Sequence, residues 1–166
     1  VDKNNKEYSK YIDKVIKTAA KKKKALYTAA FLTPASAEEL ANWWASTVKD
    51  DLLDKRFMHH MTIKFRPDAE EVIALPIDGS EVELQVVGYA SDDKGQAVLV
   101  SGVESSNDNP HITVSTAEGV SPVYSNELLS SGLVEEVATG PVLKVKIGFW
   151  NGKEARYDFD NSIYED

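Results

Sequence analysis

Two short stretches decide how this chain folds: residues 60–63, His-Met-Thr-Ile, and residues 111–114, His-Ile-Thr-Val. Both read His, apolar, Thr, apolar, and both lie in segments with strand character. On a strand, residues i and i+2 point to the same face, so each histidine shares a face with its threonine while the apolar residues point to the core. If the two strands are neighbours, we expect the two pairs to converge on one cleft.

The polar residues of these stretches are His60, Thr62, His111 and Thr113. One neutral imidazole can take a proton from water or a ribose hydroxyl, and a second, protonated imidazole can give a proton to a leaving oxygen. Histidine suits both tasks because its ordinary pKa lies near neutrality. Threonine hydroxyls can donate hydrogen bonds to non-bridging phosphate oxygens, where negative charge grows in the transition state. The pattern indicates phosphodiester chemistry that needs neither metal nor cofactor.

A single His-x-Thr would carry little weight, because Thr is common in strands. Two copies that use two of only three histidines in the chain are harder to assign to chance. The third histidine, His59, should point to the opposite face from His60 on an unbroken strand. We therefore expect His59 to be a hydrogen-bonded packing residue rather than a catalytic one.

The bulk composition predicts one compact domain spanning residues 1–166, since 42% of the 166 residues are hydrophobic. The chain has no Cys, which excludes disulfides and thiolate chemistry. No apolar run is long enough to span a membrane, and nothing reads as a signal peptide. We expect a soluble protein of a reducing compartment, the cytoplasm, with no membrane partner.

The net charge of the chain indicates what size of substrate it binds. The chain carries 27 acidic and 19 basic residues, a net charge of -8. Long nucleic acids select basic surfaces, because phosphate neutralisation supplies most of their non-specific affinity. The balance predicts a small nucleotide ligand rather than an extended RNA surface.

The periodicity along the chain predicts an α+β domain. Residues 1–24 form an expected N-terminal helical extension that ends in four lysines, which we interpret as a solvated helix end. A second helix is expected to open at the capping box Ser36–Glu39, with Leu40, Trp43, Trp44 and Thr47 on its inward stripe. A short helix is expected near residues 126–129. Strands are expected at residues 25–32, 57–65, 81–89, 97–100, 111–115, 142–150 and 155–159, the last two joined by an Asn-Gly turn.

The paired stretches resemble the motifs of the 2H phosphoesterase superfamily, which includes RNA cyclic phosphodiesterases and phage enzymes that degrade cyclic oligonucleotide signals. The likeness extends over residues 25–126 and is similar to a branch with RNA-repair-like members. It implies a bilobal, pseudo-twofold fold, with antiparallel sheets around a central cleft and helices outside. It also implies an acid–base pair, His60 and His111, and two phosphate clamps, Thr62 and Thr113. Which histidine is the base stays open.

Neighbouring residues are candidates for substrate binding. Lys64 shares the strand face of His60 and either adds charge to the phosphate site or is a solvated edge lysine. Tyr124, Ser125 and Asn126 follow the second motif and either contact base or ribose or cap the short helix. Tyr27 is a candidate for stacking on a base, although we expect it in the core instead.

These features predict a metal-independent phosphodiesterase that cleaves a small cyclic nucleotide or oligonucleotide, at a 3'–5' or 2',3'-cyclic phosphodiester. One alternative is an RNA-end 2',3'-cyclic phosphate hydrolase in RNA repair, whose partners would be RNA 3' ends. An alternative from another class is a non-catalytic nucleotide-binding domain, and a plain interaction protein is a third. The sequence leaves the oligomeric state open.

Overall fold

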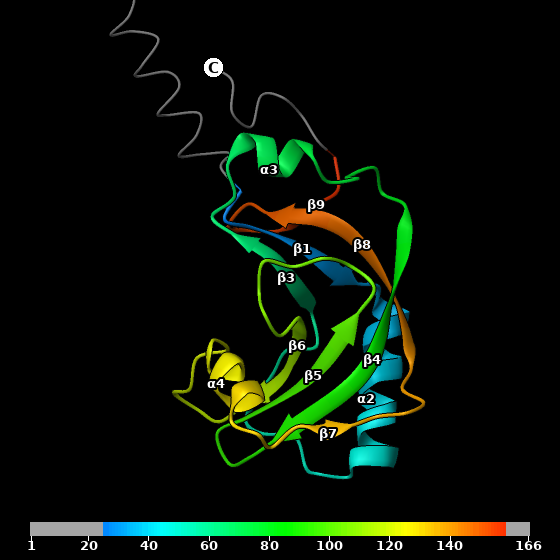
Figure 1. The fold of residues 1–166 in the computed structure, drawn as a ribbon, viewed down its shortest axis with the longest axis vertical. Coiled ribbons are helices and arrows are strands. Elements are labelled where there is room, and N and C mark those ends of the chain that lie inside the picture. Colours follow the sequence, from blue (N-terminus) through cyan, green and yellow to red (C-terminus); the bar gives the residue numbers. More distant parts are fainter. Residues whose placement is uncertain (1–24, 159–166) are drawn as a thin grey trace, which may run out of the picture.

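The computed structural model describes residues 25–158, a strand-rich domain with three short helices and a π-helical turn (Figure 1). The strands are β1 (Tyr27–Leu32), β2 (Lys55–Arg56), β3 (His60–Phe65), β4 (Glu81–Ser91), β5 (Gly95–Ser101), β6 (His111–Thr116), β7 (Glu135–Glu136), β8 (Val142–Trp150) and β9 (Ala155–Arg156). The helices are α2 (Pro34–Trp43), continued by the π-helical turn η1 (Trp44–Val48), α3 (Ala69–Ile73) and α4 (Tyr124–Ser130).

The strands form one antiparallel sheet in the order β7-β4-β5-β6-β3-β1-β8-β9. Strand β4 pairs along residues 85–91 with β5 and along residues 81–85 with β8. The second pairing closes the sheet into a barrel, so its main strands have no free edge. The antiparallel α+β class is confirmed. The division into two pseudo-twofold lobes stays a prediction, since these strands are continuous in one sheet.

The two motif strands are neighbours, as the sequence predicts. In the β3–β6 pair, Met61 lies opposite Ile112, and both side chains are fully buried. Ile63 and Val114 continue this buried row and belong to the main hydrophobic core. The apolar positions of both motifs therefore face the core, which leaves the polar positions on the other face of the sheet.

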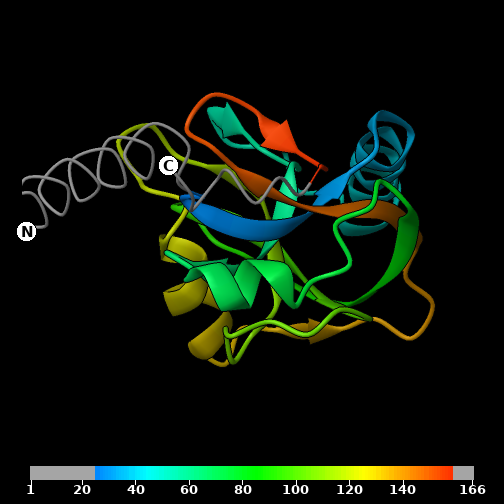
Figure 2. The same cartoon turned by 90° about the horizontal axis from the view of Figure 1, so that it is seen from above.

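Helices α2 and α4 lie on opposite sides of the barrel (Figures 1 and 2). Leu40 of α2 and Trp44 of η1 are buried in the main core and Trp43 packs against it, which confirms three residues of the predicted stripe. Thr47 is exposed, because the helix changes to a π-helical turn at Trp44, so its place in the stripe is wrong.

Helix α4 buries Leu128 and Leu129 in a second, smaller cluster against the β4–β5 hairpin. The short helix is thus confirmed and anchored on the hairpin that borders β6.

The predicted capping box at the start of α2 is wrong. The N-cap is Thr33, whose side chain accepts a hydrogen bond from the backbone N–H of Ser36, and Pro34 occupies the first helical turn. The Ser36 hydroxyl instead accepts a bond of 2.7 Å from the backbone N–H of Lys144 on β8. A capping box does occur at α3, where Asp68 and Glu71 bond reciprocally. This helix lies in a stretch that the sequence predicts only as turns.

The strand expected at residues 57–65 is broken in the middle. Met58 donates to the carbonyl of Thr113 at 2.9 Å, whereas Met61 is already paired with Ile112. The two residues between them, His59 and His60, are not paired with a residue of β6, and we call this bulge-like interruption of the β3–β6 ladder the bulge. Met58 has φ 52°, a left-handed conformation that non-glycine residues seldom adopt. The bulge breaks the simple alternation of side chains just before the first motif.

The structure tests some of the other predictions and leaves others open. The hairpin that joins β8 to β9 is confirmed by the pairing of Phe149 with Arg156, although β9 has only two residues. The N-terminal helix and its lysine run lie outside the described residues, and one domain over the whole chain stays a prediction. Between residues 25 and 158, no helix is long and apolar enough to cross a membrane.

The closed barrel predicts a sharp contrast between two leucines. Leu84 on β4 is fully buried, whereas Leu133 after α4 is 54% exposed. We expect Leu84→Ala to lower the free energy of unfolding by about 2–5 kcal/mol, because it leaves a cavity in the core. The matched control, Leu133→Ala, should change it by no more than about 0.5 kcal/mol. Urea denaturation measures both, and equal losses would contradict an enclosed core.

Candidate active site

Strands β3 and β6 bring the four motif residues together on the face of the sheet that points away from the main core. Continuing the register from Met61 and Ile112 places Thr62 opposite His111, and Thr113 lies opposite the bulge that carries His60. The four motif side chains are all partly buried. Each motif thus contributes a histidine and a threonine to one surface, which we call the motif face.

His60 is neutral at physiological pH. Burial, together with the charges of His59 and His111, lowers its pKa to about 4. The interaction with His111 places the two motif imidazoles within electrostatic reach of one another. A neutral imidazole is the form that can accept a proton.

His111 is held by the backbone. Its Nδ1 lies 2.6 Å from the carbonyl oxygen of Asn109. A carbonyl can only accept, so Nδ1 carries the proton and Nε2 is left for a ligand. Burial lowers the pKa of His111, while the hydrogen bond to Asn109 opposes that shift by stabilising the cation.

The loop that carries this carbonyl is tied to α4 through side-chain amides. Asn107 Nδ2 donates to Asn126 Oδ1 at 2.7 Å, and Asn109 Nδ2 donates to Ser130 Oγ at 3.3 Å. Asn107 Oδ1 also accepts from the backbone N–H of Asn109 at 2.9 Å. Asn126, a predicted substrate contact, thus accepts a hydrogen bond from Asn107. That bond helps to fix the loop whose Asn109 carbonyl bonds to His111.

Helix α4 also positions the hydroxyl of Thr113. Ser125 Oγ lies 2.9 Å from Thr113 Oγ1, and Ser125 is only 1% exposed. The loop before β6 holds strand β3 at the first motif, because Ser105 Oγ donates to the backbone carbonyl of Thr62 at 2.7 Å. Ser125 therefore acts on the motif face through Thr113.

The expectation for His59 is wrong in its orientation. Instead of pointing away from His60, it lies beside it, with the two Nδ1 atoms 2.9 Å apart and the rings edge to face. The bulge is the reason, since two consecutive residues in a bulge need not point to opposite faces. A histidine pair therefore stands where the sequence predicts one histidine.

Aromatic side chains surround this pair. The ring of Tyr27 on β1 stacks on His60 with centroids 4.8 Å apart, and Trp150 on β8 lies stacked 6.3 Å from Tyr27. Tyr27 is only partly buried, so its expected place in the core is wrong. The sequence does not predict Trp150 near the motif face, because only the long-range pairing of Tyr27 with Trp150 brings it there.

The remaining candidates have other partners. Lys64 Nζ lies 3.7 Å from Glu71 Oε2, in a half-exposed ion pair of the kind that contributes at most about 1 kcal/mol. The hydroxyl of Tyr124 donates to Asp92, and its ring packs so closely on Gly95 that a Cβ there would lie 2.8 Å from Cδ1. Their contact with a substrate stays a prediction. Within residues 25–158, no three His, Asp or Glu side chains are grouped to hold a metal ion.

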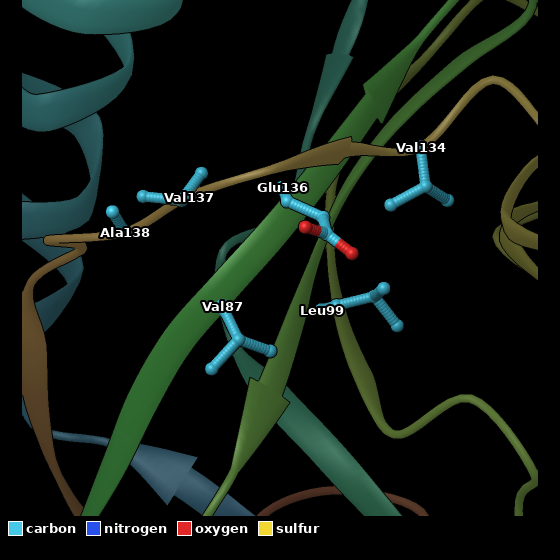
Figure 3. A pocket seen from close by; sticks show the side chains of 6 residues that line it. All are labelled: Val87, Leu99, Val134, Glu136, Val137 and Ala138. Carbon is cyan, nitrogen blue, oxygen red and sulfur yellow. The ribbon is translucent and has the colours of Figure 1, made fainter.

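A pocket of about 560 Å³ lies between strands β4 and β5 and the segment around β7 (Figure 3). It is lined by Val87, Leu99, Val134, Glu136, Val137 and Ala138. No motif residue lines it, and Leu99 and Val134 pack against the α4 cluster. Since its only charged lining residue is a carboxylate, it does not suit a phosphate group.

Two His-x-Thr pairs on one face of adjacent antiparallel strands are the arrangement that the resemblance to two-histidine phosphoesterases implies. Residues 3–147 match the family of the fungal tRNA ligase phosphodiesterase domain. The match covers most of the chain, which belongs to this family and through it to the 2H phosphoesterase superfamily. The protein is therefore a phosphoric diester hydrolase. No curated protein sequence matches the chain closely.

The contact between Ser125 and Thr113 yields a test. We expect Ser125→Ala to lower kcat/KM by about 2- to 10-fold, because the Thr113 hydroxyl loses one hydrogen bond worth about 0.5–1.5 kcal/mol. Ser131→Ala is the matched control: its hydroxyl donates to Leu128 O at the end of α4, away from the motif face. Steady-state kinetics compare the two, and equal rates for both variants would contradict a positioning role.

Proposed function

We propose that the protein hydrolyses 2',3'-cyclic phosphates, either at RNA 3' ends or on a small nucleotide, with His60 as general base and His111 as general acid. The observation that carries this is the unequal environment of two histidines on one face. His60 has its pKa lowered to about 4, whereas His111 donates its Nδ1–H to a carbonyl, a bond that favours the cation.

The reaction follows from these states. Nε2 of His60 takes a proton from water, and the hydroxide attacks phosphorus. The bond from phosphorus to one ribose oxygen breaks, and Nε2–H of His111 gives its proton to that oxygen. Thr62 and Thr113 donate hydrogen bonds to the non-bridging oxygens. The two histidines handle both protons, so the scheme uses no metal ion.

The family description supports a 2',3'-cyclic end as the substrate, since its members are phosphodiesterase domains of tRNA ligases. The partly exposed rings of Tyr27 and Trp150 beside His60 offer a surface on which a base can stack. The net charge of -8 favours a short ligand over a long RNA. A cyclic oligonucleotide is the competing substrate.

Substrate class is tested with three compounds: a 2',3'-cyclic mononucleotide, an RNA oligomer ending in a 2',3'-cyclic phosphate, and a cyclic dinucleotide. We expect turnover of the first two, undiminished by EDTA. His60→Ala and His111→Ala should each lower kcat by about 10²–10⁴-fold, the usual contribution of a general acid or base. Circular dichroism checks that both variants fold. If only the cyclic dinucleotide reacts, the substrate assignment is wrong.

A threonine pair on β6 provides a control within one strand. Thr113→Val should lower kcat, because it removes a donor to the transition state. Thr116→Val should leave kcat unchanged, since the buried Thr116 hydroxyl has no hydrogen-bond partner among the described residues. Equal effects of the two substitutions would contradict the clamp role of Thr113.

The lowered pKa values predict proton uptake on binding an anion. In the free protein both His60 and His111 have lowered pKa values, so most of the motif face is neutral at pH 7. A bound anion stabilises imidazolium and raises these pKa values, so binding is tighter at lower pH. We expect inhibition by sulfate, whose own charge is constant in this range, to weaken up to about tenfold per pH unit between pH 5.5 and 7.5. Inhibition that does not vary with pH would contradict this assignment.

A further inference from the structure

His60 and His111 differ in the group that is hydrogen-bonded to their ring nitrogen Nδ1. For His111 it is a backbone carbonyl, the oxygen of Asn109, which can only accept a hydrogen bond. For His60 it is the imidazole of His59, 2.9 Å away between Nδ1 atoms. An imidazole can accept, donate or carry a charge, so the partner of His60 is itself titratable.

The ring of His59 is fixed in place on several sides. It meets the ring of Phe31 edge to face at 5.5 Å and that of Trp150 at 5.7 Å. Its backbone carbonyl accepts from the N–H of Leu32 at 2.9 Å. The residue is nonetheless exposed, so the pair keeps contact with water.

The groups that face the pair come from three strands. Tyr27 on β1 stacks on His60 and is neutral, because burial raises its pKa to about 12. His111 on β6 lowers the pKa of His60. Strand β8 contributes the uncharged Trp150 and the cation Lys146, whose Nζ lies 5.6 Å from the ring centre of Tyr157. Among the described residues, His59 is the group hydrogen-bonded to the ring of His60.

We propose that His59 is a positioning residue that acts through His60: its Nδ1 accepts the Nδ1–H of His60, which directs Nε2 of His60 toward the phosphodiester. The inference rests on the proposed function and deepens it. When Nε2 of His60 takes the proton from water, the imidazolium holds its Nδ1–H against His59. Passing that proton along the hydrogen bond moves the charge to His59, which releases its Nε2 proton to solvent.

Two substitutions separate this role from packing. His59→Asn keeps an acceptor near the position of Nδ1 but removes the ring and its charge, whereas His59→Phe keeps the ring packing and removes the hydrogen bond. We expect His59→Phe to lower kcat about 10- to 100-fold with little change in KM, a large part of what general-base catalysis contributes. His59→Asn should recover most of that loss. In His59→Asn, which keeps an acceptor, the acid limb of kcat/KM should move to higher pH, because the charge of His59 no longer lowers the pKa of His60.

The opposite order of rates, with His59→Phe near wild type and His59→Asn impaired, would show a packing role and overturn the proposal. An acid limb that stays in place in His59→Asn would overturn it as well. Ring ¹⁵N shifts of His60 in the free protein give a readout that needs no substrate: the wild type should show the Nδ1–H tautomer and His59→Phe should lose it. If wild-type protein turns over no cyclic phosphate, the proposed function fails, while the tautomer measurement still decides the role of His59.

Discussion

The pairing of β3 with β6, with Met61 facing Ile112, is the constraint on which the rest of the structure depends. It buries one apolar residue of each motif and so sends both His-x-Thr pairs to the same outer face. A shift of one strand by one residue in this register would turn the His and Thr of its motif into the core. The cost of burying an imidazole and a hydroxyl without partners opposes such a shift. Fold and site thus depend on the same register.

The barrel holds this register through its closure. Because β4 pairs with both β5 and β8, the motif strands lie inside a continuous ring of hydrogen bonds and have no edge from which to slip. Helix α4 then fixes the motif face from outside, through Ser125 to Thr113 and through Asn126 to the loop before His111. The hydroxyl and the imidazole of the second motif are therefore held by the same short helix.

The two halves of the motif face are not equivalent, and the difference is chemical. His111 is bound by a backbone carbonyl, whereas His60 sits on a bulge beside a second imidazole. Bulges often re-aim side chains next to active sites, and here the left-handed Met58 precedes the re-aimed pair. An acid and a base need opposite protonation states, and the hydrogen bond that His111 donates to a carbonyl is the one feature of the pair that favours a cation.

The sequence by itself determined the two motif strands and their inward apolar residues, because alternation along a strand is a local property. It also determined strands β4 and β5 and helix α4. The pairing of β3 with β6, which brings the two motifs together, is a long-range contact that the tertiary structure decided. Only the tertiary structure decided where His59 points, that Tyr27 and Trp150 flank His60, and that Ser125 bonds to Thr113. A bulge depends on how two strands register, and the pairing of β1 with β8 joins segments more than one hundred residues apart. Neither leaves a local signal in the chain, since both arise from contacts made only when the barrel closes.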